Sequence, residues 1–189
     1  MAKLYFKFGT MNSSKTANAL MTIHNYEEQD MKVYLIKPEI DTRDIGIVKS
    51  RALSTGRKVN RLVKDTDKIT DYEILNYDVI IVDECQFLTE KQIDELRYIV
   101  DKHNIPVICY GLRTDFQTHL FEGSKRLFEI ADSLTEIKTI CKCGSKAIFN
   151  ARINEKGNII TSGKQIEIGG NDKYRAVCSK CYGSKLVNY

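Results

Sequence analysis

The segment Gly9-Thr10-Met11-Asn12-Ser13-Ser14-Lys15-Thr16 has the residue types and the spacing of a phosphate-binding loop. It follows an apolar run, opens a helical pattern, and differs from G-x-x-x-x-G-K-[ST] only at Ser14, where the pattern has its second glycine. In such a loop, backbone N–H groups cradle phosphate oxygens, Lys15 reaches the terminal phosphates and the Thr16 hydroxyl ligates Mg²⁺. A plain strand-to-helix turn with an exposed lysine is the alternative explanation.

Two neighbouring carboxylates follow a second apolar run. Asp83 and Glu84 come directly after Val79–Val82, which does not alternate and therefore suits a strand covered on both faces. Ligands of parallel sheets bind outside the carboxyl ends of the strands. We expect Asp83 to help hold Mg²⁺ and Glu84 to act as the general base for a phosphoryl acceptor. Acidic residues also close strands by entering a turn, which is the structural alternative here.

Four of the six cysteines lie near the C-terminus in two close pairs, one spaced C-x-C and the other C-x-x-C. Four thiolates suit a tetrahedral zinc ion, and because sulfur would fill all four positions, the zinc would be structural and not catalytic. The predicted ligands are Cys141, Cys143, Cys178 and Cys181. Four unliganded thiols are the alternative. Cys85 and Cys109 lie in or beside apolar runs and are expected to be small core residues.

The elements that position these residues alternate along the chain. Apolar runs rich in β-branched and aromatic residues predict strands at Leu4–Phe8, Lys32–Ile36, Asp78–Val82 and Val107–Gly111. Apolar periodicity predicts helices from Lys15 to about Glu28, from Thr89 to about Lys102 and from Ser124 to about Ile130. Thr89 and Gln92 have the spacing of a capping box. This alternation predicts an α/β fold, a P-loop parallel sheet flanked by helices.

Two segments depart from this order. Residues 41–61 are polar and basic, and we predict a mobile loop there. From Cys141 onward glycines are frequent, and Asn154–Asn158 resembles the turn of a hairpin that joins Ala147–Ile153 to Ile159–Thr161. We therefore predict two domains, a nucleotide-binding domain of residues 1–140 and a small zinc-binding β domain of residues 141–189.

The composition restricts the class of protein. The chain has 189 residues, of which 42% are hydrophobic and 29% charged, and a formal net charge of +4. These values exclude a disordered tail or a low-complexity linker. No run approaches the roughly 18 apolar residues of a membrane span, and the N-terminus lacks the apolar region of a signal peptide. We expect a soluble cytoplasmic protein, with neither a membrane nor a nucleic acid as its partner.

Taken together, these residues resemble the type II thymidine kinases over nearly the whole chain. The specific matches are Gly9–Thr16, Asp41-Thr42-Arg43, Asp83–Phe87, Gly111–Phe116, the four clustered cysteines and Ile168–Tyr174. The resemblance implies phosphorylation of the 5′-hydroxyl of thymidine by ATP with Mg²⁺, a structural Zn²⁺, and assembly into a homotetramer.

The resemblance also implies roles for individual residues. Glu84 and Lys15 would be catalytic, with Glu84 as the proton acceptor. The residues implied to bind ATP and Mg²⁺ are Gly9, Thr10, Met11, Asn12, Ser13, Ser14, Lys15, Thr16, Asp41, Thr42, Arg43, Asp83, Glu84, Cys85 and Gln86.

The nucleoside would bind to a different group of residues, an apolar pocket and a loop, called the lasso, that closes over it. The pocket residues are Met11, Phe87, Leu112, Phe116 and Phe121, of which Phe116 and Phe121 would suit the core equally well. The lasso residues are Gln165, Ile166, Glu167, Ile168 and Gly169, together with Tyr174.

Two departures from the family pattern bear on this interpretation. If Ser14 needs a positive φ, its side chain costs about 1–2 kcal/mol. The first cysteine pair is C-x-C, whereas vertebrate members have C-x-x-C. Two other functions stay open at this point. One is a single-lobe DExx-type ATPase in which Glu84 activates water, and the other is a zinc-ribbon nucleic-acid module that uses the basic stretch Lys49–Lys64.

Overall fold

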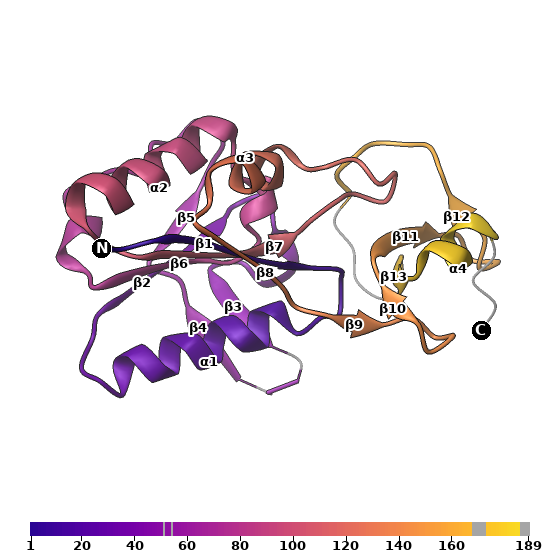
Figure 1. The fold of residues 1–189 in the computed structure, drawn as a ribbon, viewed down its shortest axis with the longest axis horizontal. Helices are drawn as coiled ribbons and strands as arrows, with labels where there is room; N and C mark the ends of the chain where they lie inside the picture. Colours follow the sequence, from indigo (N-terminus) through magenta and orange to yellow (C-terminus); the bar gives the residue numbers. More distant parts are fainter. Residues whose placement is uncertain (51, 54, 168–172, 186–189) are drawn as a thin grey trace.

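The computed structural model describes residues 1–50, 52–53, 55–167 and 173–185. Its main sheet has six parallel strands in the order β5-β2-β6-β7-β1-β8 (Figure 1). The strands are β1 Leu4–Gly9, β2 Val33–Pro38, β5 Arg61–Val63, β6 Val79–Val82, β7 Val107–Leu112 and β8 Ser133–Glu136. The predicted parallel α/β sheet is confirmed. The four predicted runs form its central strands, and the two edge strands, β5 and β8, were missed.

Helices cover both faces of this sheet. Helix α1 lies on one face, and α2 and α3 lie on the other (Figure 1). Their bounds are α1 Lys15–Glu27, α2 Glu90–His103 and α3 Glu122–Ile130. Val79 and Ile81 pack in one buried cluster with α1, and Ile80 and Val82 pack in the other with α2 and α3. Because both faces are covered, the run of β6 has no reason to alternate with polar residues.

The start of α2 follows the predicted capping box. The Thr89 side chain accepts a hydrogen bond from the Gln92 N–H, and the Gln92 side chain accepts one from the Thr89 N–H. Short 3₁₀ turns connect other elements, at η1 Thr42–Asp44, η2 Ile74–Asn76 and η3 Cys85–Phe87.

The predicted loop at residues 41–61 is wrong, because much of this segment is a two-stranded hairpin. Strands β3 Ile47–Ser50 and β4 Thr55–Lys58 pair antiparallel, and Val48 is buried in the cluster that contains α1. A single buried apolar residue is too weak a signal for a strand to be recognised from sequence.

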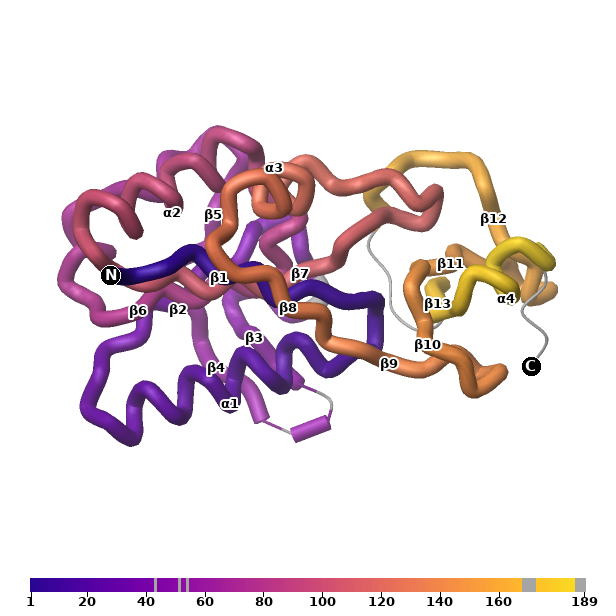
Figure 2. Tube along the Cα trace, in the orientation of Figure 1, coloured from indigo at the N-terminus to yellow at the C-terminus, as the bar shows by residue number. Residues whose placement is uncertain are grey.

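The C-terminal part has small sheets of its own. Its elements are β9 Thr139–Ile140, β10 Lys146–Ala147, β11 Phe149–Ile153, β12 Ile159–Ile160, β13 Tyr174–Val177 and α4 Ser179–Gly183. The predicted hairpin is confirmed, since β11 and β12 pair antiparallel and the Asn154 N–H donates to the Asn158 carbonyl oxygen. This part has its own buried cluster and lies beyond the carboxyl ends of the main strands (Figure 2). The division into domains 1–140 and 141–189 stays a prediction.

Candidate active site

A cavity of about 440 Å³ opens where the main sheet meets the C-terminal part. The volume is in the range of small-molecule sites. Many residues singled out from the sequence line it: Met11, Asn12, Ser14, Lys15, Thr16, Asp41, Asp83, Glu84, Gln86, Phe87, Leu112, Phe116, Phe121, Gln165, Ile166, Glu167 and Tyr174. Ile168 and Gly169 lie outside the described residues.

The phosphate-binding loop and the end of β6 meet directly. The Thr16 hydroxyl donates a hydrogen bond to Asp83 Oδ2 across 3.2 Å. Lys15 Nζ donates to the Thr10 carbonyl oxygen across 2.6 Å, and the Lys15 residue is only 8% exposed. The alternative of a turn with an exposed lysine is therefore wrong. Because the Lys15 ammonium group donates a hydrogen bond to its own loop, it lies where the loop would bind phosphates.

The loop backbone is shaped for close approach. A Cβ on Gly9 would lie 2.4 Å from Ser13 Oγ and 2.5 Å from the Ile137 carbonyl oxygen, so only glycine fits there. Asn12 and Ser14 are left-handed, at φ 62° and 60°. The Thr10 hydroxyl is buried and has no hydrogen-bond partner among the described residues. A buried hydroxyl group without a hydrogen-bond partner, in a loop with left-handed residues, is typical of a site that binds a ligand rich in oxygen atoms.

Asp83 is buried, and burial raises its pKa to about 7, with the neighbouring charge of Glu84 as the second cause. Lys15 and hydrogen bonds from the Glu84 backbone and the Thr16 side chain act in the opposite direction. A divalent cation beside this carboxylate would favour its ionised form further. The donor set of a carboxylate and a hydroxyl consists of hard oxygens, which fits Mg²⁺.

Glu84 follows in a left-handed conformation, at φ 54° and ψ 37°. Gln86 Nε2 donates to Glu84 Oε2 across 2.6 Å, while Gln86 Oε1 accepts from the Leu112 N–H across 3.0 Å. The buried amide of Gln86 thus fixes the Glu84 carboxylate relative to the end of β7. A non-glycine residue held at positive φ in the lining of a cavity is typical of a functional site.

The side chain of Cys85 lies elsewhere. It is fully buried in the core beneath the site, and burial raises the pKa of its thiol. It is not among the described residues that line the cavity. The Cys85 side chain therefore packs in the core, and its predicted part in ATP binding stays a prediction.

Aromatic and apolar side chains form the other part of the cavity. The rings of Phe87 and Phe121 meet edge to face, with centroids 5.7 Å apart. Phe116 lines the cavity and is 1% exposed. The Tyr174 hydroxyl donates to the Glu167 carbonyl oxygen across 2.8 Å, and Gln165 Nε2 donates to Asp115 Oδ2 across 2.9 Å. The first bond joins two lasso residues to each other, and the second joins Gln165 to Asp115 in the cavity lining.

Asp41 lines the cavity and takes part in a buried ion pair. Its carboxylate lies 3.1 Å from Lys37 Nζ, and both side chains are almost fully buried. Lys37 also donates to the Asp44 carbonyl oxygen across 2.8 Å, which fixes the turn η1 containing Thr42 and Arg43. Lys37 was not predicted as a site residue, although a lysine near the end of an apolar strand itself indicates a buried charge that has a partner.

Asn150 is a second site residue that was not predicted from the sequence. Its Oδ1 accepts from the Met11 N–H across 2.8 Å, and its Nδ2 donates to the Thr114 carbonyl oxygen across 3.0 Å. It thereby joins the phosphate-binding loop to β11 and to the segment after β7. No local sequence signal marks a single asparagine in a short strand. Asp115 could have been predicted from the sequence, because it stands in the motif Gly111–Phe116.

The four clustered cysteines come together as predicted. All four Sγ atoms of Cys141, Cys143, Cys178 and Cys181 lie within 4.8 Å of one another. Sulfurs that share a tetrahedral zinc at about 2.3 Å are separated by roughly 3.8 Å, so the cluster fits this ion. Gly144, at φ 85°, allows the tight C-x-C turn. Hydrogen bonds from Ser145 are the largest cause that lowers the pKa of Cys143, to about 6.

Comparison with known proteins shows the family of this chain. A family model described as thymidine kinase matches residues 2–182. The thymidine kinase of Pasteurella multocida is 46% identical over 194 residues, which cover 99% of this chain and 100% of that protein. The thymidine kinase of Haemophilus influenzae is also 46% identical, over 98% of each chain, and that of Vibrio cholerae is 44% identical, over 98% and 99%. This chain belongs to the thymidine kinase family.

Membership in the thymidine kinase family confirms the predicted resemblance. The solved structure of Bacteroides Pif1 bound to ssDNA matches 74% of this chain and 39% of its own, with a TM-score of 0.41 and 14% identity, which is too distant to support an argument.

Among the described residues, none of the helices has the length and apolarity needed to cross a membrane.

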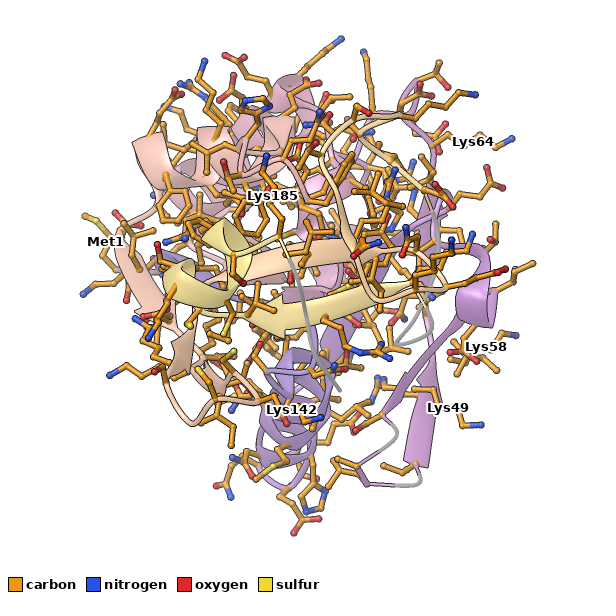
Figure 3. The ribbon with its side chains drawn as sticks, turned by 90° about the vertical axis from the view of Figure 1, so that its right-hand side faces the viewer. Met1, Lys49, Lys58, Lys64, Lys142 and Lys185 are labelled. Carbon is orange, nitrogen blue, oxygen red and sulfur yellow. The ribbon has the colours of Figure 1, made fainter. Side chains whose placement is uncertain are left out.

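The distribution of lysines does not favour the zinc-ribbon alternative for this thymidine kinase family member. Lys49, Lys58 and Lys64 lie along one edge of the molecule, apart from Lys142 (Figure 3), which stands between Cys141 and Cys143 in the chain. Lys64 also pairs with Glu39 across 3.9 Å. A nucleic-acid surface on the cysteine cluster would need its basic residues gathered on one face.

Proposed function

We propose that this protein transfers the γ-phosphoryl group of ATP to the 5′-hydroxyl of thymidine. The observation that carries the proposal is the hydrogen bond between Thr16 and Asp83, placed in one cavity with Glu84 and a set of aromatic side chains. Phosphoryl transfer depends mainly on alignment and charge stabilisation, which this arrangement supplies. Family membership and relatives named thymidine kinase support the choice of nucleoside.

The phosphate end of the cavity would hold ATP. The backbone of Gly9–Thr16 would receive the phosphates, and Lys15 would release the Thr10 carbonyl to reach their terminal oxygens. Thr16 and Asp83 would hold Mg²⁺, which stabilises negative charge on the β- and γ-phosphates when bound. Asp41, with Thr42 and Arg43 beyond it, is proposed to contact the nucleotide from the turn η1.

Glu84 is proposed to accept the proton of the 5′-hydroxyl as the attack proceeds. Gln86 would orient this carboxylate through its hydrogen bond to Oε2, because its own position is fixed by the Leu112 N–H. Glu84 follows the buried Asp83 directly, in a left-handed conformation, and the role of Asp83 would be to bind the cation.

The aromatic end of the cavity would hold thymine. Met11, Phe87, Leu112, Phe116 and Phe121 provide an apolar surface for a planar base. The lasso residues Gln165–Gly169 and Tyr174 would close over the nucleoside and exclude the water that could otherwise accept the phosphoryl group.

Three further proposals concern the metal ion, the oligomeric state and the location of the protein. Cys141, Cys143, Cys178 and Cys181 would bind one structural zinc ion per chain. The homotetramer rests on the family resemblance alone. We place the protein in the cytoplasm, where ATP is abundant and thiols stay reduced.

The test is an assay of purified protein with ATP, Mg²⁺ and thymidine, in which the product is identified by mass and by its cleavage with a 5′-nucleotidase. Thymidine 5′-monophosphate is the expected product. Formation of ADP without any phosphorylated nucleoside would favour the DExx-type ATPase instead. Binding of DNA with a steep salt dependence and no nucleoside phosphorylation would favour the nucleic-acid module.

A further inference from the structure

Arg152 is a buried arginine that lies next to the cavity without lining it. It comes from β11, and its side chain is 5% exposed. It is not among the described residues that line the cavity, but Phe116, Glu167 and Tyr174, which do line it, all contact its guanidinium group. Any influence of Arg152 on a bound nucleoside must therefore pass through these neighbours.

The contacts use most of the guanidinium group. Nε and Nη2 donate to the Tyr174 hydroxyl across 3.1 and 2.8 Å, and Nη2 also donates to the Lys164 carbonyl oxygen across 3.0 Å. Nη1 lies 3.3 Å from Glu167 Oε2. The guanidinium carbon lies 3.8 Å from the centre of the Phe116 ring. One side chain thus contacts the segment after β7, the lasso and β13.

Only arginine can make this set of contacts together. Its planar group donates in several fixed directions and also stacks on an aromatic face, whereas an ammonium is a compact point charge. A cation over an aromatic ring within about 6 Å is attracted to it, and more strongly when both are desolvated, as here. The charge of Arg152 is matched by Glu167, so the buried cation has a partner.

The partners of Arg152 also have a particular order in the chain. Glu167 and Tyr174 stand on either side of residues 168–172, and the Tyr174 hydroxyl, which accepts from Arg152, donates in turn to the Glu167 carbonyl oxygen. Arg152 therefore fixes both flanks of the lasso relative to Phe116.

We propose that Arg152 is a positioning residue for nucleoside binding, which holds Phe116 and the two flanks of the lasso in one arrangement. The proposal rests on the proposed function. Its consequence is selective: loss of the planar contacts weakens thymidine binding, while ATP binding at the opposite end of the cavity is preserved.

The experiment compares Arg152→Lys with the wild type and with Arg61→Lys. Arg61 is a matched control, because it also holds a loop by bonds to a carboxylate, Asp71, and to two carbonyl oxygens, and it is not among the described residues that line the cavity. The dissociation constant of thymidine is measured by calorimetry in the absence of ATP, and KM for ATP is measured at saturating thymidine. Arg152→Lys should raise the thymidine constant on the order of tenfold and leave KM for ATP within twofold. Arg61→Lys should change neither value.

The outcomes separate this inference from the proposed function. A wild-type protein that neither binds nor phosphorylates thymidine contradicts the proposed function itself. A functional wild type with an Arg152→Lys variant that binds thymidine normally overturns the positioning role alone. Equal losses of thymidine and ATP affinity also overturn it, because they indicate a merely structural contribution.

A second variant keeps the inference testable if Arg152→Lys does not fold. Glu167 has a side chain that is 45% exposed, so Glu167→Gln should not disturb folding. It should raise the thymidine dissociation constant a few-fold, at unchanged KM for ATP. Where both variants fold, the double variant should lose less affinity than the product of the two single losses, since the residues act on one contact. Unchanged thymidine binding by Glu167→Gln would contradict the inference.

Discussion

The Tyr182 hydroxyl donates a hydrogen bond to the Phe116 carbonyl oxygen across 2.6 Å. Tyr182 follows Cys181 in α4, and its ring packs against Phe149 with centroids 5.1 Å apart. Phe116 lines the candidate active site. The bond therefore connects the cysteine cluster to the wall proposed to receive thymine, and it gives a physical route by which the cluster can affect nucleoside binding.

Tyr182→Phe tests this route. The variant removes one hydrogen bond and leaves the ring in place, so the thymidine dissociation constant should rise about fivefold, which corresponds to about 1 kcal/mol. Zinc content and KM for ATP should stay at their wild-type values. Tyr72→Phe, at a residue that is 90% exposed, is the control and should change nothing. Unaltered thymidine affinity in Tyr182→Phe would show that the bond does not position Phe116.

Removal of a cysteine ligand should have a larger effect of the same kind. Elemental analysis of the wild type should give about one zinc per chain. Cys178→Ser should lose the zinc, loosen the C-terminal part and weaken thymidine binding much more than ATP binding, because zinc in such sites supplies folding energy. Cys109→Ser, far from the cluster, should keep its zinc. A metal-free wild type with full activity, or equal losses of thymidine and ATP affinity in Cys178→Ser, would contradict this account.

Ser14 is expected to tolerate glycine. Its φ of 60° is left-handed, and its side chain makes no capping hydrogen bond to α1. Glycine removes a steric cost of about 1–2 kcal/mol at this position, which offsets its greater freedom in the unfolded chain. Chemical denaturation should show an unchanged or slightly higher stability, and kcat/KM should not fall as much as tenfold. Ala19→Gly, within α1, should instead lose about 1 kcal/mol or more.

Glu84→Gln separates catalysis from binding. The amide keeps the shape of the side chain but cannot accept the proton, so kcat should fall by about 10²–10⁴. The dissociation constants of ATP and thymidine should stay within a few-fold of the wild type. Glu28→Gln, on the surface beyond α1, is the control and should keep full activity. A Glu84→Gln variant that retains most of its kcat would refute the assignment of Glu84 as the base.

Local patterns predicted much of the fold and of the site. The phosphate-binding loop is contiguous in sequence, and Asp83 ends an apolar run, so both could be placed at the carboxyl edge of the sheet before the structure was known. The spacing of the four cysteines likewise predicted their cluster. In each case the chemistry is carried by residues close to one another in the chain or by a recognisable spacing.

Long-range contacts account for what was missed. Arg152 contacts Phe116, and Asn150 contacts Met11, across the junction between the two parts of the chain. No pattern around either residue indicates such a partner. The β3–β4 hairpin escaped prediction because Val48 is its one apolar residue in the buried cluster. The edge strand β5 is too short to show a period.

The stoichiometry of the reaction tests the central claim most directly. ADP and thymidine monophosphate are quantified together by chromatography over a time course, with Mg²⁺ and ATP, in the presence and absence of thymidine. The account predicts one thymidine monophosphate for each ADP, and negligible ADP when thymidine is left out, because phosphoryl transfer is coupled to the nucleoside in a closed cavity. ADP formation at the same rate with and without thymidine would contradict it.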